Sequence, residues 1–261
     1  MTNNKVAIIT GSASGIGRAI ATRLHHDGAK VVIADINLAA AQKTANELNG
    51  LALETDVTNS ESVDNMIAAA KEEYGSIDIL VNNAGIHIQK LVVDLTDEDW
   101  DAIQNTNSRG VFYTSRAAAK IMMRQDSGRI INIITRLGGN PFSSAYMASK
   151  SAIWGFTQCL ALELAPYNVT VNAVAPGHIG PGTGMTKWFE AKAEALGQDW
   201  QTFEKNVLSS IPLGRWCSLE DVGAAVSFLA SDEASFITSE TINVTGGWSS
   251  YGATPKKEVF E

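Results

Sequence analysis

Short apolar segments alternate with longer amphipathic segments along most of the chain. The apolar segments are nearly continuous, which is typical of strands that are buried on both faces of a parallel sheet. The longer segments, such as 62–75 and 218–232, have the periodicity of helices. The alternation has no intervening linker and predicts one doubly wound α/β domain over residues 1–261, with helices on both faces of a seven-stranded parallel sheet. The expected strands are 6–10, 30–35, 51–57, 77–84, 129–134, 169–176 and 240–247.

One region departs from this alternation. Residues 177–215 open with the sequence GHIGPGTGMTKWF, in which the glycines and the proline favour a mobile loop. Trp188 and Phe189 follow in the same region and are candidates for part of a lid. We therefore expect a substrate loop at about 177–215.

The first expected strand runs directly into a glycine-rich turn, TGSASGIG, at residues 10–17. Gly11, Gly15 and Gly17 would let the backbone turn tightly and approach a pyrophosphate at the N-terminus of the following helix. Taken alone, such a turn can also be an ordinary connection between a strand and a helix. Asp35 favours the first interpretation, because an acidic residue at the end of the second strand can bind the hydroxyls of an adenosine ribose.

The charge of this region indicates which dinucleotide would bind. The carboxylate of Asp35 would repel the 2′-phosphate of NADP. The turn offers Ser12, Ala13 and Ser14, and no arginine that could receive that phosphate. We therefore expect NAD as the cofactor.

Composition narrows the class of protein further. The formal net charge of −8 argues against nucleic acid or an anionic membrane as the main partner. The N-terminus lacks the pattern of a signal peptide, and no apolar run approaches the length of a membrane span. Neither the two cysteines nor the four histidines show metal-ligand spacing, so we expect no metal. A cytoplasmic enzyme that acts on a small molecule is the expectation.

A tyrosine precedes a lysine by four residues in the sequence YMASK at 146–150. On a helix this spacing places Tyr146 and Lys150 on one face. A phenol with an ordinary pKa of about 10 is a poor base near neutrality. The ammonium of Lys150 and the positive nicotinamide ring of NAD should lower the pKa of Tyr146. Tyr146 is therefore the candidate acid/base for hydride transfer, and Lys150 is the candidate for binding the nicotinamide ribose.

Five motifs occur in the order of one enzyme family: TGSASGIG (10–17), NNAG (82–85), NSRG (107–110), YMASK (146–150) and PG (176–177). Together they resemble the short-chain dehydrogenase/reductases over essentially the whole chain. Within the family, the sequence as a whole most resembles the sugar and polyol dehydrogenases. The resemblance implies a single Rossmann-type domain, a nicotinamide cofactor and a homotetramer.

The resemblance also implies roles for single residues. Asp56 and Val57 would contact the adenine, and Asn83 would contact the ribose and stabilise the backbone. Ile179 would meet the nicotinamide carboxamide. Asn107 would hold a water that links the catalytic lysine to solvent. The expected cofactor-binding residues are Gly11, Ser14, Gly15, Ile16, Gly17, Asp35, Asp56, Val57, Asn83, Tyr146, Lys150 and Ile179.

The hydroxyl that would orient the substrate oxygen is less regular. The family has a serine just after the strand expected at 129–134, and this chain has Thr135 there. The segment from Thr135 to Tyr146 is also shorter than is usual in the family. Threonine keeps the hydroxyl, although β-branching narrows its rotamers. We expect Thr135 to take this role, with Ser143 and Ser144 as rivals.

The substrate should meet residues that follow the expected strands. Four are candidates: His87, Arg136, His178 and Trp188. This polar lining favours a sugar, a polyol or a small anionic hydroxy compound over a steroid or a long chain. Arg136 could hold an anionic group bidentately, or it could point to solvent or pair at a subunit interface.

Two other functions remain open. An acyl-thioester 3-ketoreductase of the same fold would normally use NADP and a basic docking surface, and both Asp35 and the acidic composition disfavour it. A non-catalytic NAD-binding regulator is disfavoured by the intact Tyr146 and Lys150. We expect an NAD-dependent oxidoreductase that acts on a secondary alcohol.

Overall fold

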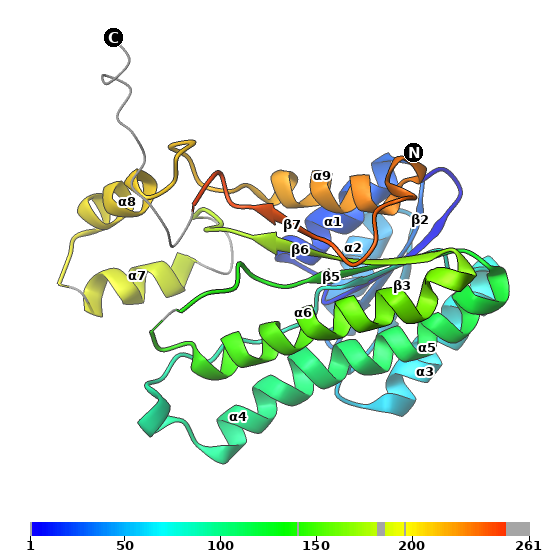
Figure 1. Ribbon diagram of the computed structural model, residues 1–261, viewed down its shortest axis with the longest axis horizontal. Coiled ribbons are helices and arrows are strands. Elements are labelled where there is room, and N and C mark those ends of the chain that lie inside the picture. The colour runs from blue at the N-terminus through cyan, green and yellow to red at the C-terminus, as the bar shows by residue number, and fades with distance from the viewer. Residues whose placement is uncertain (1, 140, 182–185, 196, 249–261) are drawn as a thin grey trace, which may run out of the picture.

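The computed structural model describes residues 2–139, 141–181, 186–195 and 197–248. Seven parallel strands form one sheet in the order β3-β2-β1-β4-β5-β6-β7 (Figure 1). Their bounds are β1 Val6–Thr10, β2 Lys30–Asp35, β3 Leu51–Glu54, β4 Ile79–Asn82, β5 Gly128–Ile133, β6 Val169–Pro176 and β7 Thr241–Val244. Four of them, β1, β4, β5 and β6, are buried at every position, as their apolar sequences predict.

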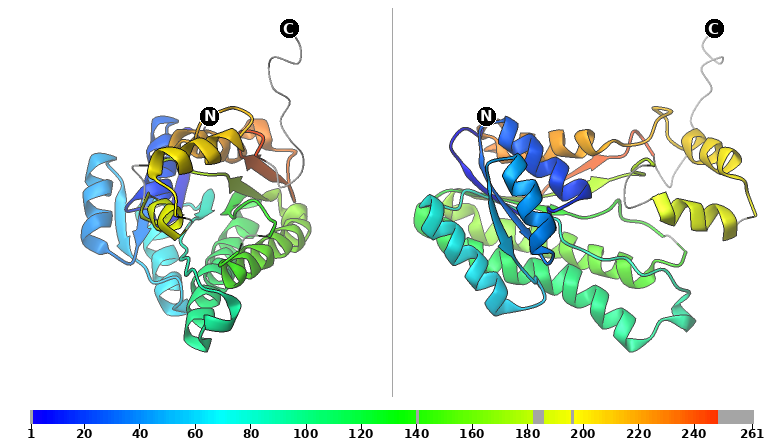
Figure 2. Two further views of the ribbon diagram at one scale, coloured as in Figure 1. Left: turned by 90° about the vertical axis from the view of Figure 1, so that its left-hand side faces the viewer. Right: turned by 180° about the vertical axis from the view of Figure 1, so that it is seen from behind.

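Helices cover both faces of the sheet (Figure 2). On one face, α1 (Gly15–His26), α2 (Leu38–Glu47) and α9 (Leu219–Ala230) share an apolar core with the sheet. On the other face, α3 (Ser60–Tyr74), α5 (Gly110–Gln125) and α6 (Ser144–Leu164) form a second core. The fold is therefore the predicted doubly wound, Rossmann-type α/β domain.

The connection between the two halves of the sheet determines where a ligand can bind. The chain runs outward from β1 through β2 to β3, and then returns to place β4 on the other side of β1. Helices that follow β1 and β4 therefore leave on opposite faces of the sheet. In open α/β sheets, such a reversal opens a crevice at the carboxyl ends of the strands.

The expected strand at 51–57 is too long, because β3 ends at Glu54. The chain turns at Asp56, whose Oδ1 accepts a hydrogen bond from the backbone N–H of Thr58 at 2.9 Å. An aspartate that bonds the backbone two residues ahead favours a turn over a strand. The residues after β3 are thereby directed toward the edge of the sheet at which the other strands end.

The expectation of a loop at 177–215 was wrong for most of that region. It contains two helices, α7 (Thr186–Ala195) and α8 (Trp200–Ser209). Phe189 is 1% exposed and packs in a small apolar cluster with Ala193 and Phe203. Phe189 and Ala193 are four residues apart, so their side chains share one helix face. This spacing indicates a helix, but the glycines just before it led us to expect a loop. Residues 182–185 lie outside the described residues.

The remaining elements are short. Helix α4 (Asp97–Ile103) leads through a π-helical turn (Gln104–Arg109) into α5 without a break. Within the part of the chain that the structure describes, 3₁₀ turns lie at Val92–Asp94, Ala165–Tyr167 and Asp232–Ala234. The π-helical turn is the element of this group that lies next to the candidate site.

Candidate active site

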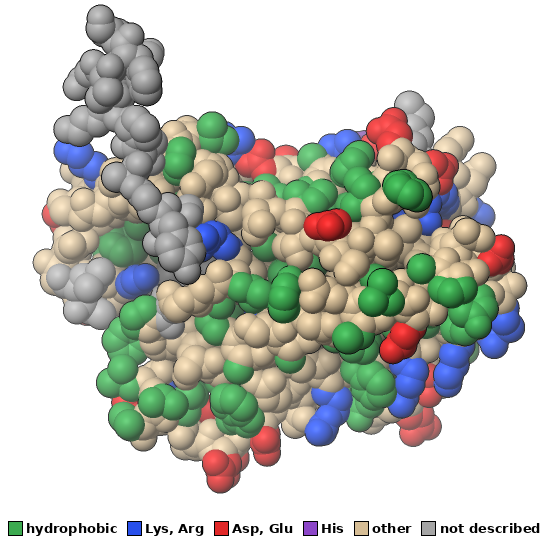
Figure 3. Space-filling model, in the orientation of Figure 1, with side chains coloured by type: hydrophobic (Ala, Val, Ile, Leu, Met, Phe, Trp, Pro, Cys, Tyr) green, Lys and Arg blue, Asp and Glu red, His purple; other side chains and the backbone are tan. Residues whose placement is uncertain are grey.

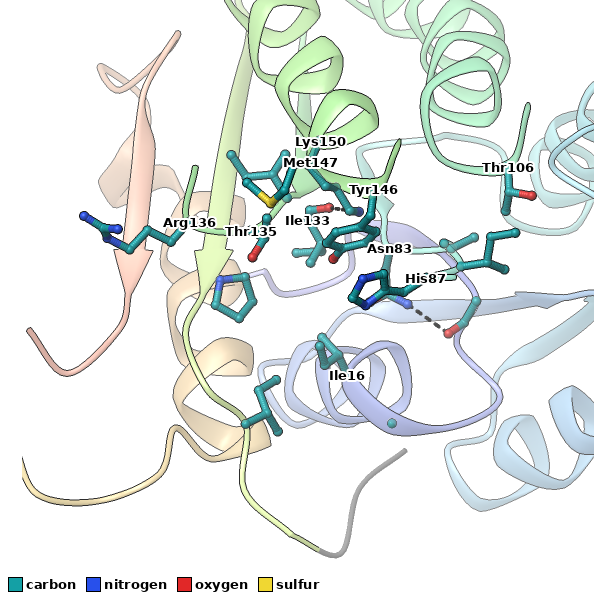
Figure 4. Close-up of a pocket in the computed structure, with 18 of the residues that line it drawn as sticks. Ile16, Asn83, His87, Thr106, Ile133, Thr135, Arg136, Tyr146, Met147 and Lys150 are labelled. Atoms are coloured by element: carbon teal, nitrogen blue, oxygen red, sulfur yellow. Dashed lines mark hydrogen bonds between the residues drawn. The ribbon is translucent and has the colours of Figure 1, made fainter. Parts of the chain in front are cut away.

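A cleft of about 780 Å³ opens at the carboxyl ends of the strands (Figure 4). Its walls come from residues at the carboxyl ends of the strands, which lie far apart in the sequence. They include Gly11 after β1, Asp35 at the end of β2, Asn83 after β4, Thr135 after β5 and Gly177 after β6. The cleft therefore lies in the crevice that the sheet order creates.

The glycine-rich turn forms one end of this cleft and leaves room there for an anion. A Cβ atom on Gly17 would lie 2.3 Å from the carbonyl oxygen of Gly11, so only glycine lets helix and turn pack this closely. Gly15 has a φ of +55° with nothing within 4 Å of where its Cβ would be, and it lines the cleft beside Ile16. Ser14 precedes α1 without a side-chain capping bond, and it is exposed outside the cleft lining. The open N-terminus of α1 can therefore receive a pyrophosphate.

Asp35 stands next to this turn. Its carboxylate accepts hydrogen bonds from the backbone N–H groups of Ala13 and Asn37, each at 3.0 Å. Arg18, a basic residue in the first turn of α1, forms an ion pair with Glu47. An acceptor for ribose hydroxyls is thus held in place, and it is negatively charged where NADP would carry its 2′-phosphate. These residues fit the ribose of a nicotinamide dinucleotide.

The expected adenine and ribose contacts also face the cleft. Asp56, Val57 and Asn83 are among the lining residues, as is the buried Ile179. The amide nitrogen of Asn83 donates to the carbonyl oxygen of Gly11 at 2.9 Å. Asn83 therefore ties the glycine-rich turn to the end of β4, and its contact with a ribose stays a prediction.

The tyrosine and the lysine lie on the first turns of α6. Lys150 is buried, and its Nζ donates a hydrogen bond to the carbonyl oxygen of Ile133 at 2.8 Å. The same Nζ lies 5.6 Å from the centre of the Tyr146 ring. Figure 4 shows the hydroxyl groups of Thr135 and Tyr146 pointing into the same part of the cleft. A substrate oxygen could meet both hydroxyls there.

Burial controls the ionisation of this pair in the protein alone. It raises the pKa of Tyr146 to about 12 and lowers the pKa of Lys150 to about 8. In the protein alone, removal of the phenol from water therefore raises the pKa of Tyr146, and the fall that Lys150 and NAD together should cause stays a prediction. The positive charge of an oxidised nicotinamide would have to provide the rest of the effect.

Asn107 lies in the π-helical turn and is fully buried. Its Oδ1 accepts from the backbone N–H of Ile86 at 2.8 Å, and its Nδ2 donates to Ser149 Oγ at 2.9 Å. These bonds tie the segment after β4 to helix α6. A Cβ on Gly85 would lie 3.1 Å from Asn107 Oδ1 and 3.6 Å from Lys150 Nζ, so a glycine here allows both side chains to approach. The water-holding role of Asn107 stays a prediction.

The structure separates Thr135 from the two rival serines. Thr135 lines the cleft, whereas Ser144 is exposed and outside its lining. Ser143 is buried, and its Oγ lies 3.0 Å from Nε2 of His87. This geometry favours Thr135 as the hydroxyl that would face a substrate.

The candidate substrate residues differ in how close they lie to Tyr146. His87 lies against Tyr146, whereas Arg136 points away from it (Figure 4). Burial and the charge of Lys192 lower the pKa of His178 to about 4, so this side chain is neutral near pH 7. The side chain of Trp188 lies outside the described residues.

Trp248 is a lining residue that the sequence interpretation missed. Its ring lies 5.3 Å from the guanidinium of Arg136 and 4.3 Å from the ring of His178. Trp248 follows the sequence TGG just after β7. An aromatic residue directly after a strand end was the available signal.

Among the residues that the structure describes, no helix is long and apolar enough to cross a membrane. Within the same residues, no three His, Cys, Asp or Glu side chains gather in a way that could hold a metal ion.

Comparison with known proteins matches nearly the whole chain to reductases. Residues 11–249 match a family model described as enoyl-(acyl carrier protein) reductase. The 3-oxoacyl-[acyl-carrier-protein] reductase of Vibrio cholerae is 41% identical over 247 residues, which cover 93% of this chain and 96% of the relative. The reductase of the same name from Escherichia coli is 40% identical, with the same coverage of both chains.

Solved structures agree with the sequence comparison. A protein from Sinorhizobium meliloti, described as a short-chain alcohol dehydrogenase, has a TM-score of 0.87 and 34% identity. The match covers 94% of this chain and 96% of that one.

Proposed function

The chain belongs to the short-chain dehydrogenase/reductase family, and we propose that it uses NAD to interconvert a secondary alcohol and a ketone in the cleft. One observation carries the proposal. Tyr146, Lys150 and Thr135 meet in the same cleft as the open helix N-terminus and the carboxylate of Asp35. A proton-transferring group and a dinucleotide site in one cleft are what hydride transfer requires.

Each side chain has a separate task in the proposed reaction. NAD supplies the hydride acceptor for oxidation and, in its reduced form, the hydride donor for reduction. Thr135 would donate a hydrogen bond to the substrate oxygen and fix its position. Tyr146 would take the proton of the alcohol during oxidation and return it during reduction. Lys150 would stabilise the phenolate and bind the ribose next to the nicotinamide.

The relatives indicate which substrate class should be tested first. The Vibrio cholerae and Escherichia coli proteins are 3-oxoacyl-[acyl-carrier-protein] reductases that match nearly the whole chain. They support a 3-oxoacyl thioester, the alternative of the sequence interpretation, more strongly than the sugar or polyol that we expected first. We propose this thioester class as the first candidate.

A polyol or a small hydroxy compound remains the second candidate, for two reasons. His87 and His178 give the cleft a polar lining, and the net charge is −8. On the face shown in Figure 3, Lys and Arg side chains are mixed with Asp and Glu. A mixed surface offers less attraction to an acidic carrier protein than a basic patch would.

A cofactor and substrate screen tests the proposal. Purified protein is assayed for oxidation of NADH and NADPH with 3-oxoacyl thioesters, and for reduction of NAD and NADP with sugars, polyols and hydroxy acids. We expect turnover with NAD or its reduced form in at least one substrate class. Turnover confined to NADP and its reduced form would contradict the cofactor proposal. No turnover in either class, by protein that binds NAD, would favour the non-catalytic regulator.

We also propose a homotetramer, as the resemblance implies. Large apolar side chains are exposed on the helices of one face, a common feature of surfaces that associate. They include Trp100, Phe112, Trp154 and Leu162.

The cofactor preference should depend on Asp35. In Asp35→Ala, the preference for NAD over NADP in kcat/KM should fall by at least about tenfold, because the hydroxyl acceptor and the repulsive charge are both lost. Steady-state kinetics with the two cofactors measures this change. Asp35→Asn is the matched control, since it removes the charge and keeps an oxygen acceptor. If both variants keep the wild-type ratio, Asp35 does not select the cofactor.

Arg136 should matter only for anionic substrates. If its guanidinium binds a carboxylate, phosphate or sulfonate, Arg136→Ala should raise KM for such substrates by about tenfold or more and change KM for neutral polyols little. Arg136→Lys keeps the charge but loses the bidentate geometry, so its KM for anionic substrates should lie between the values of the wild type and Arg136→Ala. Equal effects on both substrate classes would mean that Arg136 does not bind an anionic group and acts through its contact with Trp248.

A further inference from the structure

A histidine stacks on the proposed catalytic tyrosine. The rings of His87 and Tyr146 are 4.2 Å apart between centres and 29° from parallel. Figure 4 shows the imidazole of His87 beside the phenol ring within the cleft. His87 belongs to the segment after β4, whereas Tyr146 lies on α6, so the contact joins two separate walls of the cleft.

A hydrogen bond holds the imidazole in this place. Its Nε2 lies 3.0 Å from Oγ of Ser143, which is buried. Ser143 is the residue that precedes α6, a position at which a serine hydroxyl commonly caps the helix. The Ser143 side chain makes no capping bond here. Its hydroxyl is therefore committed to His87 rather than to the helix.

The backbone supports the same connection. The backbone N–H of Lys90 donates to the carbonyl oxygen of Phe142 at 3.1 Å. Lys90 is three residues after His87, and Phe142 is the residue before Ser143. The segment after β4 is thus joined to the start of α6 at two neighbouring points. Both points hold the segment that carries His87 close to the start of α6.

We propose that His87 is a positioning residue, which holds the ring of Tyr146 in its orientation toward the substrate and covers one face of that ring against water. The proposal rests on the proposed role of Tyr146 as the acid/base. Its geometric support is the stack, the bond to Ser143 and the backbone link beside it.

The electrostatic surroundings are consistent with a neutral imidazole. Burial and the charge of Lys150 lower the pKa of His87, so the ring carries no proton charge near pH 7. Among the described residues, Lys150 is the charged group that lowers the pKa of His87, and burial raises the pKa of Tyr146. A neutral ring can exclude water from the phenol without stabilising the phenolate by its own charge. Ionisation of Tyr146 would then depend more strongly on the bound cofactor.

Tyrosine titration tests this role without any substrate. Tyrosinate absorbance is measured against pH in the wild-type protein and in His87→Ala, and the matching Tyr146→Phe protein is subtracted from each to isolate Tyr146. We expect Tyr146 to ionise at lower pH in His87→Ala, because water reaches the uncovered face. His87→Phe keeps a ring that can stack but loses the bond to Ser143, so it should titrate closer to the wild type than His87→Ala does. Because no turnover is needed, this result is independent of whether the proposed reaction is found.

Kinetics gives the second readout on an active substrate. In His87→Ala, kcat should fall by about tenfold or more with a smaller change in KM, because a misplaced acid/base lowers the rate of the chemical step. His87→Phe should retain more of kcat than His87→Ala. Circular dichroism and NAD binding serve as controls for folding.

Two results would overturn the proposal. One is an unchanged titration of Tyr146 in folded His87→Ala. The other is a kinetic loss confined to KM, which would make His87 a substrate-binding residue. If His87→Ala does not fold, His87→Asn replaces it, since it keeps a polar atom for Ser143 and removes the ring. The same two outcomes then decide.

Discussion

Tyr146→Phe is expected to lower kcat by about 10²–10⁴-fold, the range that general acid/base groups contribute. The substitution removes the phenolic hydroxyl and leaves the ring that stacks on His87. Binding of NAD should remain, because the glycine-rich turn, Asp35 and Lys150 are unchanged. Steady-state kinetics gives kcat, and isothermal titration calorimetry gives the affinity for NAD.

Tyr167→Phe is a matched control for this experiment. Tyr167 lies in the 3₁₀ turn after α6 and is 37% exposed, outside the cleft lining. The same loss of a hydroxyl should leave kcat near the wild-type value there. A Tyr146→Phe protein that keeps more than about a tenth of wild-type kcat would mean that another group carries the proton.

Thr135→Val should have the second-largest effect. Valine keeps the shape of threonine and deletes its hydroxyl, so the hydrogen bond to the substrate oxygen is lost. The cost should be about 10²–10³-fold in kcat if that bond strengthens in the transition state. Thr135→Ser sheds only a methyl group and should stay active. Parallel kinetics on the two variants separates the hydroxyl from the shape.

Ser144 provides the test against the rival assignment. Ser144→Ala should be near wild type, because this side chain is exposed at the start of α6 and does not line the cleft. An active Thr135→Val protein together with an inactive Ser144→Ala protein would show that the wrong hydroxyl was chosen.

The fold was predictable from the sequence because burial on two faces leaves a clear pattern. VAIIT and RIINII admit few alternatives to central strands, and the structure has β1 and β5 there. Gly17 likewise indicated the start of the helix after β1. In the structure a Cβ at this position would collide with the carbonyl oxygen of Gly11. Local sequence and tertiary packing impose the same requirement at these positions.

The parts that failed depend on contacts between distant segments. The sequence around Phe189 shows glycines but does not show Phe203, with which it packs, so a loop was expected where α7 forms. The raised pKa of Tyr146 in the protein alone was not foreseen for a similar reason. The charge of Lys150 could be inferred from spacing, whereas the depth at which the phenol is buried arises from the assembled cleft.

The π-helical turn at Gln104–Arg109 gives the helix from Asp97 to Gln125 a dislocation in its register. A π turn holds a residue more than an α turn, and each α-helical residue corresponds to a rotation of about 100°. Deletion of one residue in this turn would restore an unbroken α-helix but rotate the two ends relative to one another. Asn107 could then keep its bond to Ser149 only if one end gave up its own packing. The segment should therefore tolerate substitutions on its outer side far better than any change in its length.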